Sequence, residues 1–442
     1  MRESLSRTVI ALLMLFMVAC GDGACRSVDR SRLAIMPIKL ESGSIMHSAY
    51  RYQPGRSWIT ENSKHSDRMT LRPIVPRVAE TFLPYQNDIH FPAAEKPAPG
   101  SLMVDASKMI AGMHSVDVQA SAWGMPPVTT IAGSGIAGYR DGYSRIAQFF
   151  YPISIATDSN NNVYVADFWN HKIRKINNTT KLVTTIAGRE ASLYFPGGVA
   201  VNRKGDVYIA DSFNNKIKKA SADGSITTIA GDDAAGYLDG KGSQARFYIP
   251  MGIAVGVDGS IYVADSGNNL IRKITEDGTV TTVSGSSAGF ADGSLRKAKF
   301  YYPSGVAIDA ETGLIYVIDS RNNRIRKLNI NNNTVSTLAG SGAVGARDGK
   351  ASIASFNFYG YYTTGIVVGF DGEVYVADSY NQKIRRIDPG GNVTTLSGST
   401  YGLEDGSAAA ARYAYPTGLA MGRNGCLFVA DFYNHAIRRI SK

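Results

Sequence analysis

The stretch "VYVADFWNHKIRKI", residues 163–176, recurs five times further along this chain of 442 residues. The later copies begin at Val207, Ile261, Ile315, Val374 and Leu427, so successive copies lie 44, 54, 54, 59 and 53 residues apart. Each copy consists of two short runs of β-branched and aromatic residues joined by a loop with an aspartate and an asparagine, a pattern typical of a β-hairpin. A period of this length indicates a repeat architecture in which each copy is one supersecondary unit.

The residues around each hairpin predict two further strands per repeat. A strand such as "PGGVAV" (196–201) precedes the hairpin, and a strand such as "VTTIAG" (183–188) follows it. The turn between the first two strands has Asn161 in the first repeat and glycine in the others, residue types that accept the positive φ of tight turns. Each repeat is therefore a four-stranded antiparallel meander. Since one such sheet cannot bury both apolar faces alone, we expect an all-β, six-bladed β-propeller.

The two ends of the repeat region predict how the ring closes. A fourth-strand sequence at residues 128–133 precedes the first repeat, whereas the last hairpin is followed only by the end of the chain. We therefore expect the strand at 128–133 to complete the sixth blade, and we place the propeller domain at residues 128–442.

The motif "VADxxNxxIRK", preceded by a "P-x-G-[VI]-A" strand, resembles the NHL repeat, and the resemblance covers roughly residues 128–442 in all six copies. The resemblance implies a six-bladed propeller used mostly to bind proteins or nucleic acids, with a minority of related propellers acting as metal-dependent lyases or hydrolases. The fold alone does not choose among these functions.

The N-terminus predicts export. Arg2 and Arg7 precede the apolar run "TVIALLMLFMVA" (8–19), which is too short to span a bilayer and has the layout of a signal peptide. The run ends at Cys20, and "MVAC" resembles the lipobox of bacterial lipoproteins, whose cysteine is lipidated. We predict a lipoprotein anchored in the cell envelope, periplasmic or on the cell surface; secretion without a lipid is the alternative.

Residues between the signal peptide (1–19) and the propeller show no repeat. This leader, residues 20–127, contains "FPAAEKPAPG" (91–100) and lacks sustained periodicity. We expect a loosely ordered tether, with a small folded domain as the alternative.

Every hairpin carries an aspartate and, seven residues later, a basic residue. A catalytic group is needed once, whereas these residues recur in every blade. A charge on a strand between stacked blades is partly buried and must be paired, so we interpret the pairs as structural. The pairs are Asp167 with Arg174, Asp211 with Lys218, Asp265 with Arg272, Asp319 with Arg326, Asp378 with Arg385, and Asp431 with Arg438. The asparagine three residues after each aspartate, as in Asn170, is expected to hold a left-handed backbone conformation.

A second motif, "GYRDG" (138–142), lies in the loop that leads into the first blade. Similar motifs lead into four other blades, at residues 236–240, 289–293, 345–349 and 402–406, whereas the second blade has the shorter "GREASLYFP" (188–196). These loops and the hairpin loops are expected on one face of the ring, where binding residues concentrate. Calcium binding by their aspartates is an alternative to a simple turn, but the oxygen-rich spacing of a calcium loop is missing.

The charge and residue content of the chain narrow the classes of function to consider. The formal net charge of +10 allows contact with anionic lipid headgroups or polysaccharides. The export signal and the lack of a dense basic cluster disfavour nucleic acid. Residues 128–442 hold two histidines, one cysteine and no signature of a nucleophile with a positioned base. We therefore predict a non-enzymatic binding scaffold without cofactor or metal, with a protein, polyanionic or saccharide ligand on the loop face; a metal-dependent lyase or hydrolase is the alternative.

The first and last hairpins differ from the others and give the candidate binding site. They read "DFWNH" (167–171) and "DFYNH" (431–435), whereas the other four have serine after the aspartate and Asn or Gln in place of the histidine. Because blades 1 and 6 are neighbours in a closed ring, we expect a cluster of Phe168, Trp169, His171, Phe432, Tyr433 and His435. Exposed aromatic rings beside histidine suit a ring-bearing or apolar partner. Two alternatives are that the hairpins are close copies packed against loops, or that the histidines bind a metal with Asp167 or Asp431.

Overall fold

The structure, a computed structural model, describes residues 34–39, 45–51, 59–60, 127–188, 191–221, 223–358 and 365–441. The chain divides into two compact units, Met1–Met113 and His114–Lys442. In the first unit, β1(Ala34–Lys39), β2(Ile45–Arg51) and β3(Ile59–Thr60) form a small antiparallel sheet. The predicted signal peptide, Cys20 and most of the predicted leader lie outside the described residues.

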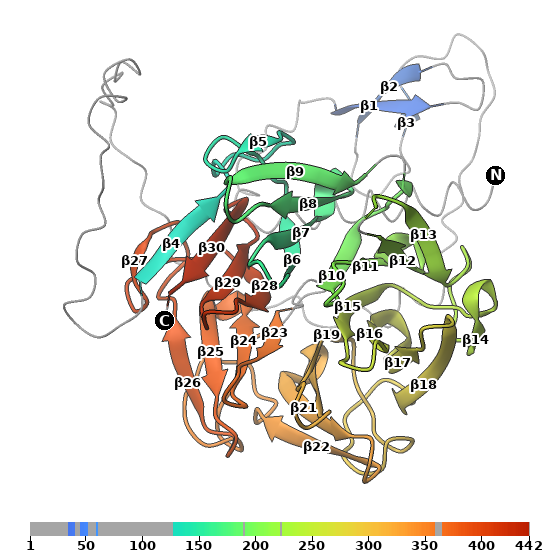
Figure 1. The fold of residues 1–442 in the computed structure, drawn as a ribbon, viewed down its shortest axis with the longest axis vertical. Coiled ribbons are helices and arrows are strands. Elements are labelled where there is room, and N and C mark those ends of the chain that lie inside the picture. The colour runs from blue at the N-terminus through green and yellow to red at the C-terminus, as the bar shows by residue number, and fades with distance from the viewer. Residues whose placement is uncertain are drawn as a thin grey trace. The chain divides into compact units, whose positions relative to one another are not determined.

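Six antiparallel sheets arranged around a common centre make up the second unit (Figure 1). This confirms the predicted all-β, six-bladed propeller. Blade 1 contains β6(Pro152–Thr157), β7(Val163–Asp167), β8(Lys172–Ile176) and β9(Leu182–Ala187). Blade 2 contains β10(Pro196–Val201), β11(Val207–Asp211), β12(Lys216–Ala220) and β13(Ile226–Ala230). Blade 3 contains β15(Pro250–Val255), β16(Ile261–Asp265), β17(Leu270–Ile274) and β18(Thr279–Gly285).

The other three blades repeat this order. Blade 4 contains β19(Pro303–Ile308), β20(Ile315–Asp319), β21(Arg324–Asn329) and β22(Thr334–Ala339). Blade 5 contains β23(Ile366–Val368), β24(Val374–Asp378), β25(Lys383–Ile387) and β26(Val393–Ser397). Blade 6 contains β28(Pro416–Met421), β29(Leu427–Asp431), β30(Ala436–Ile440) and β4(Pro127–Ala132). Three blades gain a short fifth strand at the outer edge: β5(Gly142–Tyr143) on β9, β14(Gly240–Lys241) on β18, and β27(Gly406–Ser407) on β4.

The ring closes through the N-terminal strand, as predicted. β4 pairs antiparallel with β30, and Ile440 lies opposite Val128. The backbone N–H of Ser441 also donates to the Pro127 carbonyl at 2.9 Å. The sixth blade therefore combines strands from both ends of the propeller domain.

The core lies between the blades. The described residues form six hydrophobic clusters, one at each junction between neighbouring blades. The first strands form the inner ring, and their glycines permit close approach of neighbouring blades. A Cβ atom on Gly252 would lie 2.6 Å from the Ser304 carbonyl oxygen, and one on Gly418 would lie 2.8 Å from that of Ile153. The side chains of Ile153 and Met251 are buried at this inner ring.

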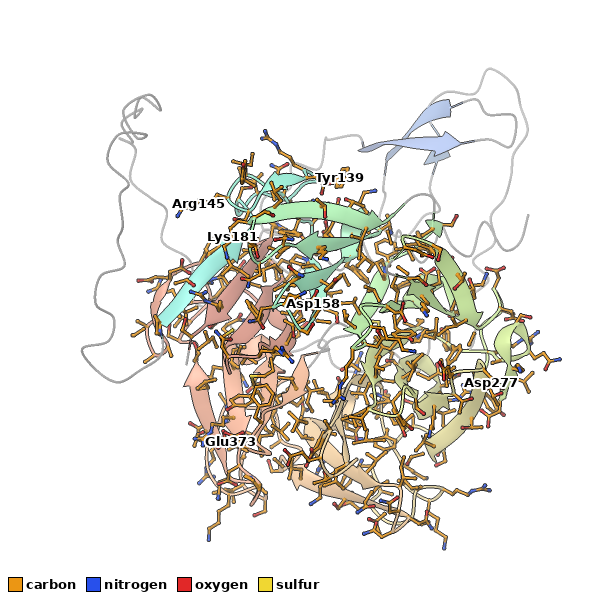
Figure 2. All side chains as sticks on the ribbon, viewed as in Figure 1. Tyr139, Arg145, Asp158, Lys181, Asp277 and Glu373 are labelled. Carbon is orange, nitrogen blue, oxygen red and sulfur yellow. The ribbon has the colours of Figure 1, made fainter. Side chains whose placement is uncertain are left out.

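The propeller has two unlike faces, set by the register of its strands. One face, the loop face, carries the hairpin loops and the long loops between blades. In five blades the proline that begins the first strand lies opposite the hairpin aspartate, as Pro152 does opposite Asp167. Figure 2 shows Tyr139 and Arg145 on the long loop that leads into blade 1. The other face, the turn face, carries the tight turns, including Asp158 and Lys181 (Figure 2). Among the described residues, no helix is long and apolar enough to cross a membrane.

Candidate functional site

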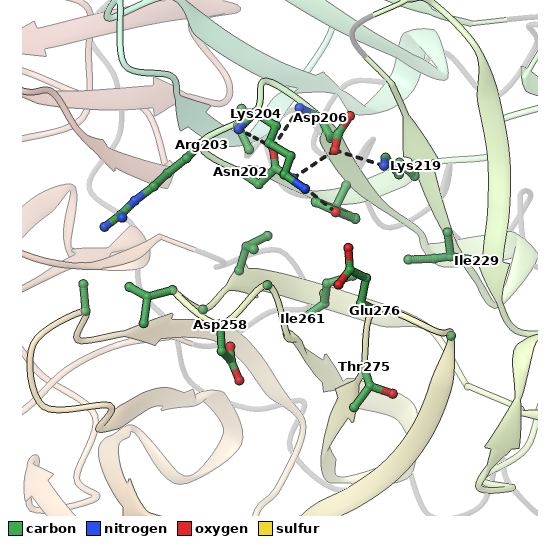
Figure 3. Close-up of a pocket in the computed structure, with 18 residues that line it drawn as sticks. Asn202, Arg203, Lys204, Asp206, Lys219, Ile229, Asp258, Ile261, Thr275 and Glu276 are labelled. Carbon is green, nitrogen blue, oxygen red and sulfur yellow. Dashed lines mark hydrogen bonds and ion pairs between the residues drawn. The ribbon is translucent and has the colours of Figure 1, made fainter.

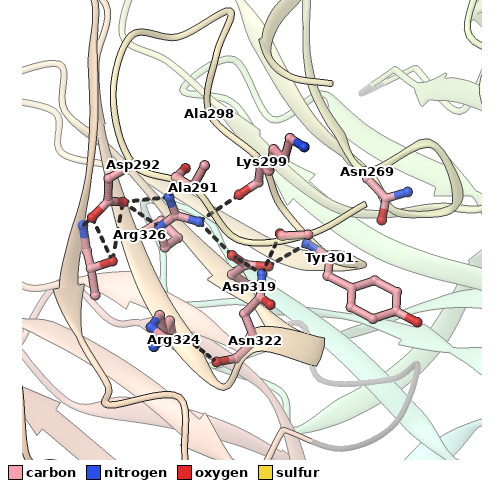
Figure 4. A network of polar contacts seen from close by, with 12 residues as sticks. Asn269, Ala291, Asp292, Ala298, Lys299, Tyr301, Asp319, Asn322, Arg324 and Arg326 are labelled. Carbon is pink, nitrogen blue, oxygen red and sulfur yellow. Dashed lines mark hydrogen bonds and ion pairs between the residues drawn. The ribbon is translucent and has the colours of Figure 1, made fainter. Parts of the chain in front are cut away.

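Each hairpin aspartate lies in a polar network with the basic residue seven positions later. In blade 4, Arg326 Nη1 donates to Asp319 Oδ2 at 2.7 Å, and Nη2 donates to Asp292 Oδ1 at 2.6 Å (Figure 4). The Arg326 and Asp319 side chains are both fully buried. The guanidinium therefore joins two carboxylates, one from the hairpin and one from the loop that leads into the blade.

The structure places all six predicted pairs in contact, and five of them contain this second aspartate. In each of these five blades the arginine lies between the hairpin aspartate and an aspartate of the leading loop. The arginine and loop aspartate are Arg174 and Asp141, Arg272 and Asp239, Arg326 and Asp292, Arg385 and Asp348, and Arg438 and Asp405. The second blade has no such loop motif, and its Lys218 Nζ reaches Asp211 at 3.4 Å and the Ala191 carbonyl. The second aspartate was not predicted from the sequence, although the blade without the loop motif is also the blade with lysine in place of arginine.

The asparagines three residues after the hairpin aspartates have a different role from the one predicted. Asn170 Nδ2 donates to Asp167 Oδ2 at 2.9 Å and to the Gly138 carbonyl at 2.8 Å, and its backbone is part of the 3-10 turn η5(Phe168–Asn170). The left-handed residue is the next one, His171, with φ of 55°. The expectation for Asn170 was therefore wrong by one position, because its side chain is needed to satisfy the buried aspartate.

The left-handed residue of each hairpin connects one blade to the next. His171 Nδ1 accepts a hydrogen bond from the Phe195 N–H of blade 2 at 2.9 Å, and His435 Nδ1 accepts one from the Tyr151 N–H of blade 1 at 3.3 Å. In the other blades the same bond is accepted by Asn215, Asn269, Asn323 and Gln382. The histidines thus share a structural role with the amides that replace them elsewhere.

The two histidines are held neutral by their surroundings. Burial lowers the pKa of His435 to about 4. Burial and, to a lesser extent, the charge of Lys172 lower the pKa of His171 to about 4. Since a protonated Nδ1 cannot accept the hydrogen bond from the next blade, the neutral form is the one that fits this geometry.

Phe168 and Phe432 lie in the core. Their side chains are 0% and 3% exposed, so the expectation that they are exposed was wrong. At this position in blades 2, 3 and 5, serine donates to the carbonyl of the proline that begins the next blade, as Ser266 does to Pro303 at 2.6 Å. Without that hydroxyl, an aromatic contact takes its place: the Phe432 ring stacks on Tyr151 at 4.7 Å between centroids.

Trp169 and Tyr433 belong to a continuous chain of aromatic rings on the loop face, which we call the aromatic arc. Neighbouring ring centroids along it lie 4.8 to 6.0 Å apart. The arc runs over blades 5, 6, 1 and 2 through Tyr380, Tyr415, Tyr433, Tyr151, Trp169, Phe195 and Phe213. The structure therefore brings the predicted aromatic residues together, whereas His171 and His435 lie at two different junctions of blade 1.

The aromatic arc does not follow the six-fold repeat. The second residue after the hairpin aspartate is aromatic in four blades, as Trp169 is in blade 1, but blades 3 and 4 have Gly267 and Arg321 there. Tyr151 and Tyr415, which link the arc, have φ of 54°, and this positive φ belongs to the scaffold, because the equivalent residues Phe195, Ile249 and Tyr302 have φ of 50°, 49° and 55°. The sequence signal for these linking residues was available: each directly precedes the proline that begins a blade.

The described residues contain no group of three or more His, Cys, Asp or Glu side chains that could hold a metal ion. A cleft of about 540 Å³ lies between blades 2 and 3, on the turn face (Figure 3). Lys204, Asp206, Lys219 and Glu276 are among its lining residues, and Lys219 pairs with Asp206 at 2.9 Å. The cleft is therefore separate from the aromatic arc.

Comparisons with known proteins agree with this architecture. The model of the NHL repeat family matches residues 149–176, 193–219 and 300–328, and the model of the Teneurin NHL domain matches residues 234–292. The chain is 27% identical over 379 residues to Protein SUPPRESSOR OF QUENCHING 1, chloroplastic, of Arabidopsis thaliana, covering 81% of this chain and 32% of that protein. It is 27% identical over 382 residues to human NHL repeat-containing protein 2, covering 77% and 46%.

Solved structures share the fold. A structural genomics protein of unknown function from Bacteroides thetaiotaomicron has a TM-score of 0.58 at 21% identity, covering 71% of this chain and 75% of that one. An auxiliary nutrient binding protein from the same organism has a TM-score of 0.56 at 17% identity, covering 71% of this chain and 76% of that one.

The protein is a six-bladed β-propeller whose blades are joined by a repeated Asp–Arg hairpin and its backbone connections. Its chain contains NHL repeats. The chain spans about a third to a half of the length of the two curated relatives described above.

Proposed function

We propose that the protein is a non-enzymatic recognition propeller that binds a ring-bearing ligand on the aromatic arc. The supporting observation is the arc's departure from the repeat: the hairpin aspartate and asparagine of the scaffold recur in all six blades, whereas the arc is confined to four. Trp169, Phe213 and Tyr433 are partly exposed there, and Tyr380 is 38% exposed. Aromatic rings offer large apolar faces at low conformational cost, which suits stacking against a flat ligand.

The ligand class proposed is an anionic polysaccharide, whose sugar rings stack on the arc. The net charge of +10 favours an anionic partner over a cationic one. The N-terminal sequence, with its signal-like run and Cys20, supports export and a lipid anchor, which would place the arc where such polymers occur.

The test measures binding of purified anionic and neutral polysaccharides to the full chain by calorimetry. The combined variant Trp169→Ala and Tyr433→Ala is expected to lose at least about tenfold in affinity. Tyr380→Ala, which truncates the most exposed ring of the arc, should weaken binding with little effect on the melting temperature. Tyr237→Ala is the matched control, because Tyr237 is 73% exposed but lies on the blade 3 loop outside the arc.

Two results would contradict the proposal. Equal affinity of the arc variants and the Tyr237→Ala control would place the ligand elsewhere. Absence of binding to every polysaccharide tested would remove this ligand class.

A further inference from the structure

The outer edge of a blade is covered by the loop that leads into that blade, in five of the six blades. In blade 4, Gly293 and Val335 exchange both backbone hydrogen bonds, at 3.0 and 2.7 Å. The next residue inward, Asp292, accepts the Thr337 N–H through Oδ2 at 3.1 Å. The same glycine and aspartate contacts recur in blades 1, 3, 5 and 6.

Blade 2 lacks this cover. Its outer strand is β13, and its register against β12 places Ile226 and Thr228 where blade 4 has Val335 and Thr337. The outward backbone groups of Ile226 and Thr228 have no hydrogen-bond partner within the described part of the chain. Thr227 and Thr228 are exposed. Within the described residues, β13 is therefore an open sheet edge, which natural proteins usually protect.

Three features of blade 2 change together. Its leading loop, residues 188–195, is shortened, the Asp-Gly motif is missing, and the buried base is Lys218 in place of arginine. Lys218 lies opposite Thr228 in the register. In blade 2, the positive charge of Lys218 therefore remains beneath the position at which the leading loops of the other five blades place an aspartate carboxylate.

We propose that the edge of β13 binds an extended segment of a partner protein that carries an Asp-Gly pair. The segment adds as an antiparallel fifth strand, as β5 adds to β9 and β14 to β18. Its aspartate accepts the Thr228 N–H and faces Lys218, and its glycine pairs with Ile226. The choice of occupant rests on the five loops of this chain that make the same contacts, and strand addition to an open edge is a common mode of peptide recognition. The proposal is independent of the aromatic arc.

The test uses the full chain and a synthetic peptide with the sequence of residues 402–408, GLEDGSA. Amide hydrogen exchange at Ile226 and Thr228 is measured with and without the peptide. The peptide should slow exchange at both amides by about tenfold or more at saturation. A peptide with asparagine in place of its aspartate is the matched control and should bind more weakly, because it lacks the carboxylate.

Two variants locate the effect. Thr228→Pro removes an N–H that faces outward and that β12 does not use, a position where an edge strand tolerates proline, and it should abolish binding. In the second variant, the blade 3 loop, residues 231–249, replaces residues 188–195, and Lys218→Arg is added, so that blade 2 covers its own edge. This variant should also lose binding of the peptide. It tests the proposal if Thr228→Pro does not fold.

Three outcomes would overturn the proposal. The first is protection of both amides in the full chain without peptide, which would show that the chain covers this edge itself. The second is concentration-dependent protection without peptide, which would make a second copy the occupant. The third is exchange that the peptide does not slow.

Discussion

The imidazole of His435 in blade 6 accepts a hydrogen bond from the backbone N–H of Tyr151 in blade 1, at 3.3 Å. This bond crosses the seam at which the ring closes, next to the stacked rings of Phe432 and Tyr151. His171 makes the equivalent bond to Phe195 at the other junction of blade 1. Blade 1 is thus attached to both neighbours through a neutral histidine.

Replacing both histidines by asparagine should reduce the acid sensitivity of the protein. The pKa of each histidine is about 4 in the folded protein, against about 6.5 in the unfolded chain. The unfolded chain therefore binds more protons between these values, so the stability supplied by the neutral rings is complete above pH 6.5 and is lost as the pH falls toward 4. The effect should be on the order of 1 kcal/mol per histidine, allowing for partial exposure. Urea unfolding between pH 4 and 7.5 measures it.

Asparagine is the matched replacement because Asn215 and Asn269 accept the same bond in blades 2 and 3, at 3.0 and 2.8 Å. The comparison between variant and wild type removes the contribution of the buried aspartates, which is the same in both. Parallel pH profiles for the two proteins would show that these histidines do not cause the acid sensitivity.

Arg174→Lys should destabilise blade 1, although it keeps the positive charge. The guanidinium reaches Asp167 and Asp141 at 2.6 Å each, and a lysine ammonium lacks the forked geometry that serves both. A loss of about 1–3 kcal/mol in unfolding free energy is expected. Lys218→Arg in blade 2 is the control: it should bring no comparable gain, since blade 2 has no second aspartate. A gain of similar size in blade 2 would contradict this explanation.

The scaffold could be predicted from the sequence because its determinants are repeated. Six copies of the hairpin fixed the number of blades, and the unmatched fourth strand before residue 134 fixed the closure. The second aspartate of each network was missed because Asp141 is 33 residues from Arg174 in sequence. One difference between the blades indicated this contact: blade 2, which lacks the loop motif, also has Lys218 where the other blades have arginine.

The candidate site was predicted less completely, for a physical reason. The similarity of the first and last hairpins correctly placed Trp169 and Tyr433 in one cluster, because neighbouring blades meet at the seam. Whether each ring faces solvent or the core depends on the next blade, however. Phe432 is buried by Tyr151, a residue from the loop that leads into blade 1, and no pattern within one hairpin indicates that contact.

Cys20→Ser should release the protein from membranes if Cys20 carries the predicted lipid. A lipid anchor supplies apolar surface that partitions into the bilayer, and serine cannot be modified through a thioether. Fractionation of cells that express each form, followed by detection of the protein in membrane and soluble fractions, provides the measurement. Cys25→Ser is the matched control, because Cys25 lies outside the lipobox-like "MVAC", and it should leave partitioning unchanged. Equal partitioning of all three forms would contradict lipidation of Cys20 and would leave secretion without a lipid as the remaining interpretation.

Removal of β4 should destabilise the whole ring. A chain that starts at residue 136 lacks β4, whereas one that starts at residue 126 keeps it, and both lack the same leader. Without β4, the backbone groups of β30 that face it lose their partners, and Asp405 loses the Thr130 N–H that it accepts at 2.9 Å. Val128, buried against blade 5, and Ala132, buried against blade 1, are lost from two hydrophobic clusters. The shorter chain should therefore lose at least about 3 kcal/mol of unfolding free energy and aggregate more readily through the open edge. Calorimetric melting and light scattering measure the two effects, and equal melting temperatures would show that β4 is dispensable for closure.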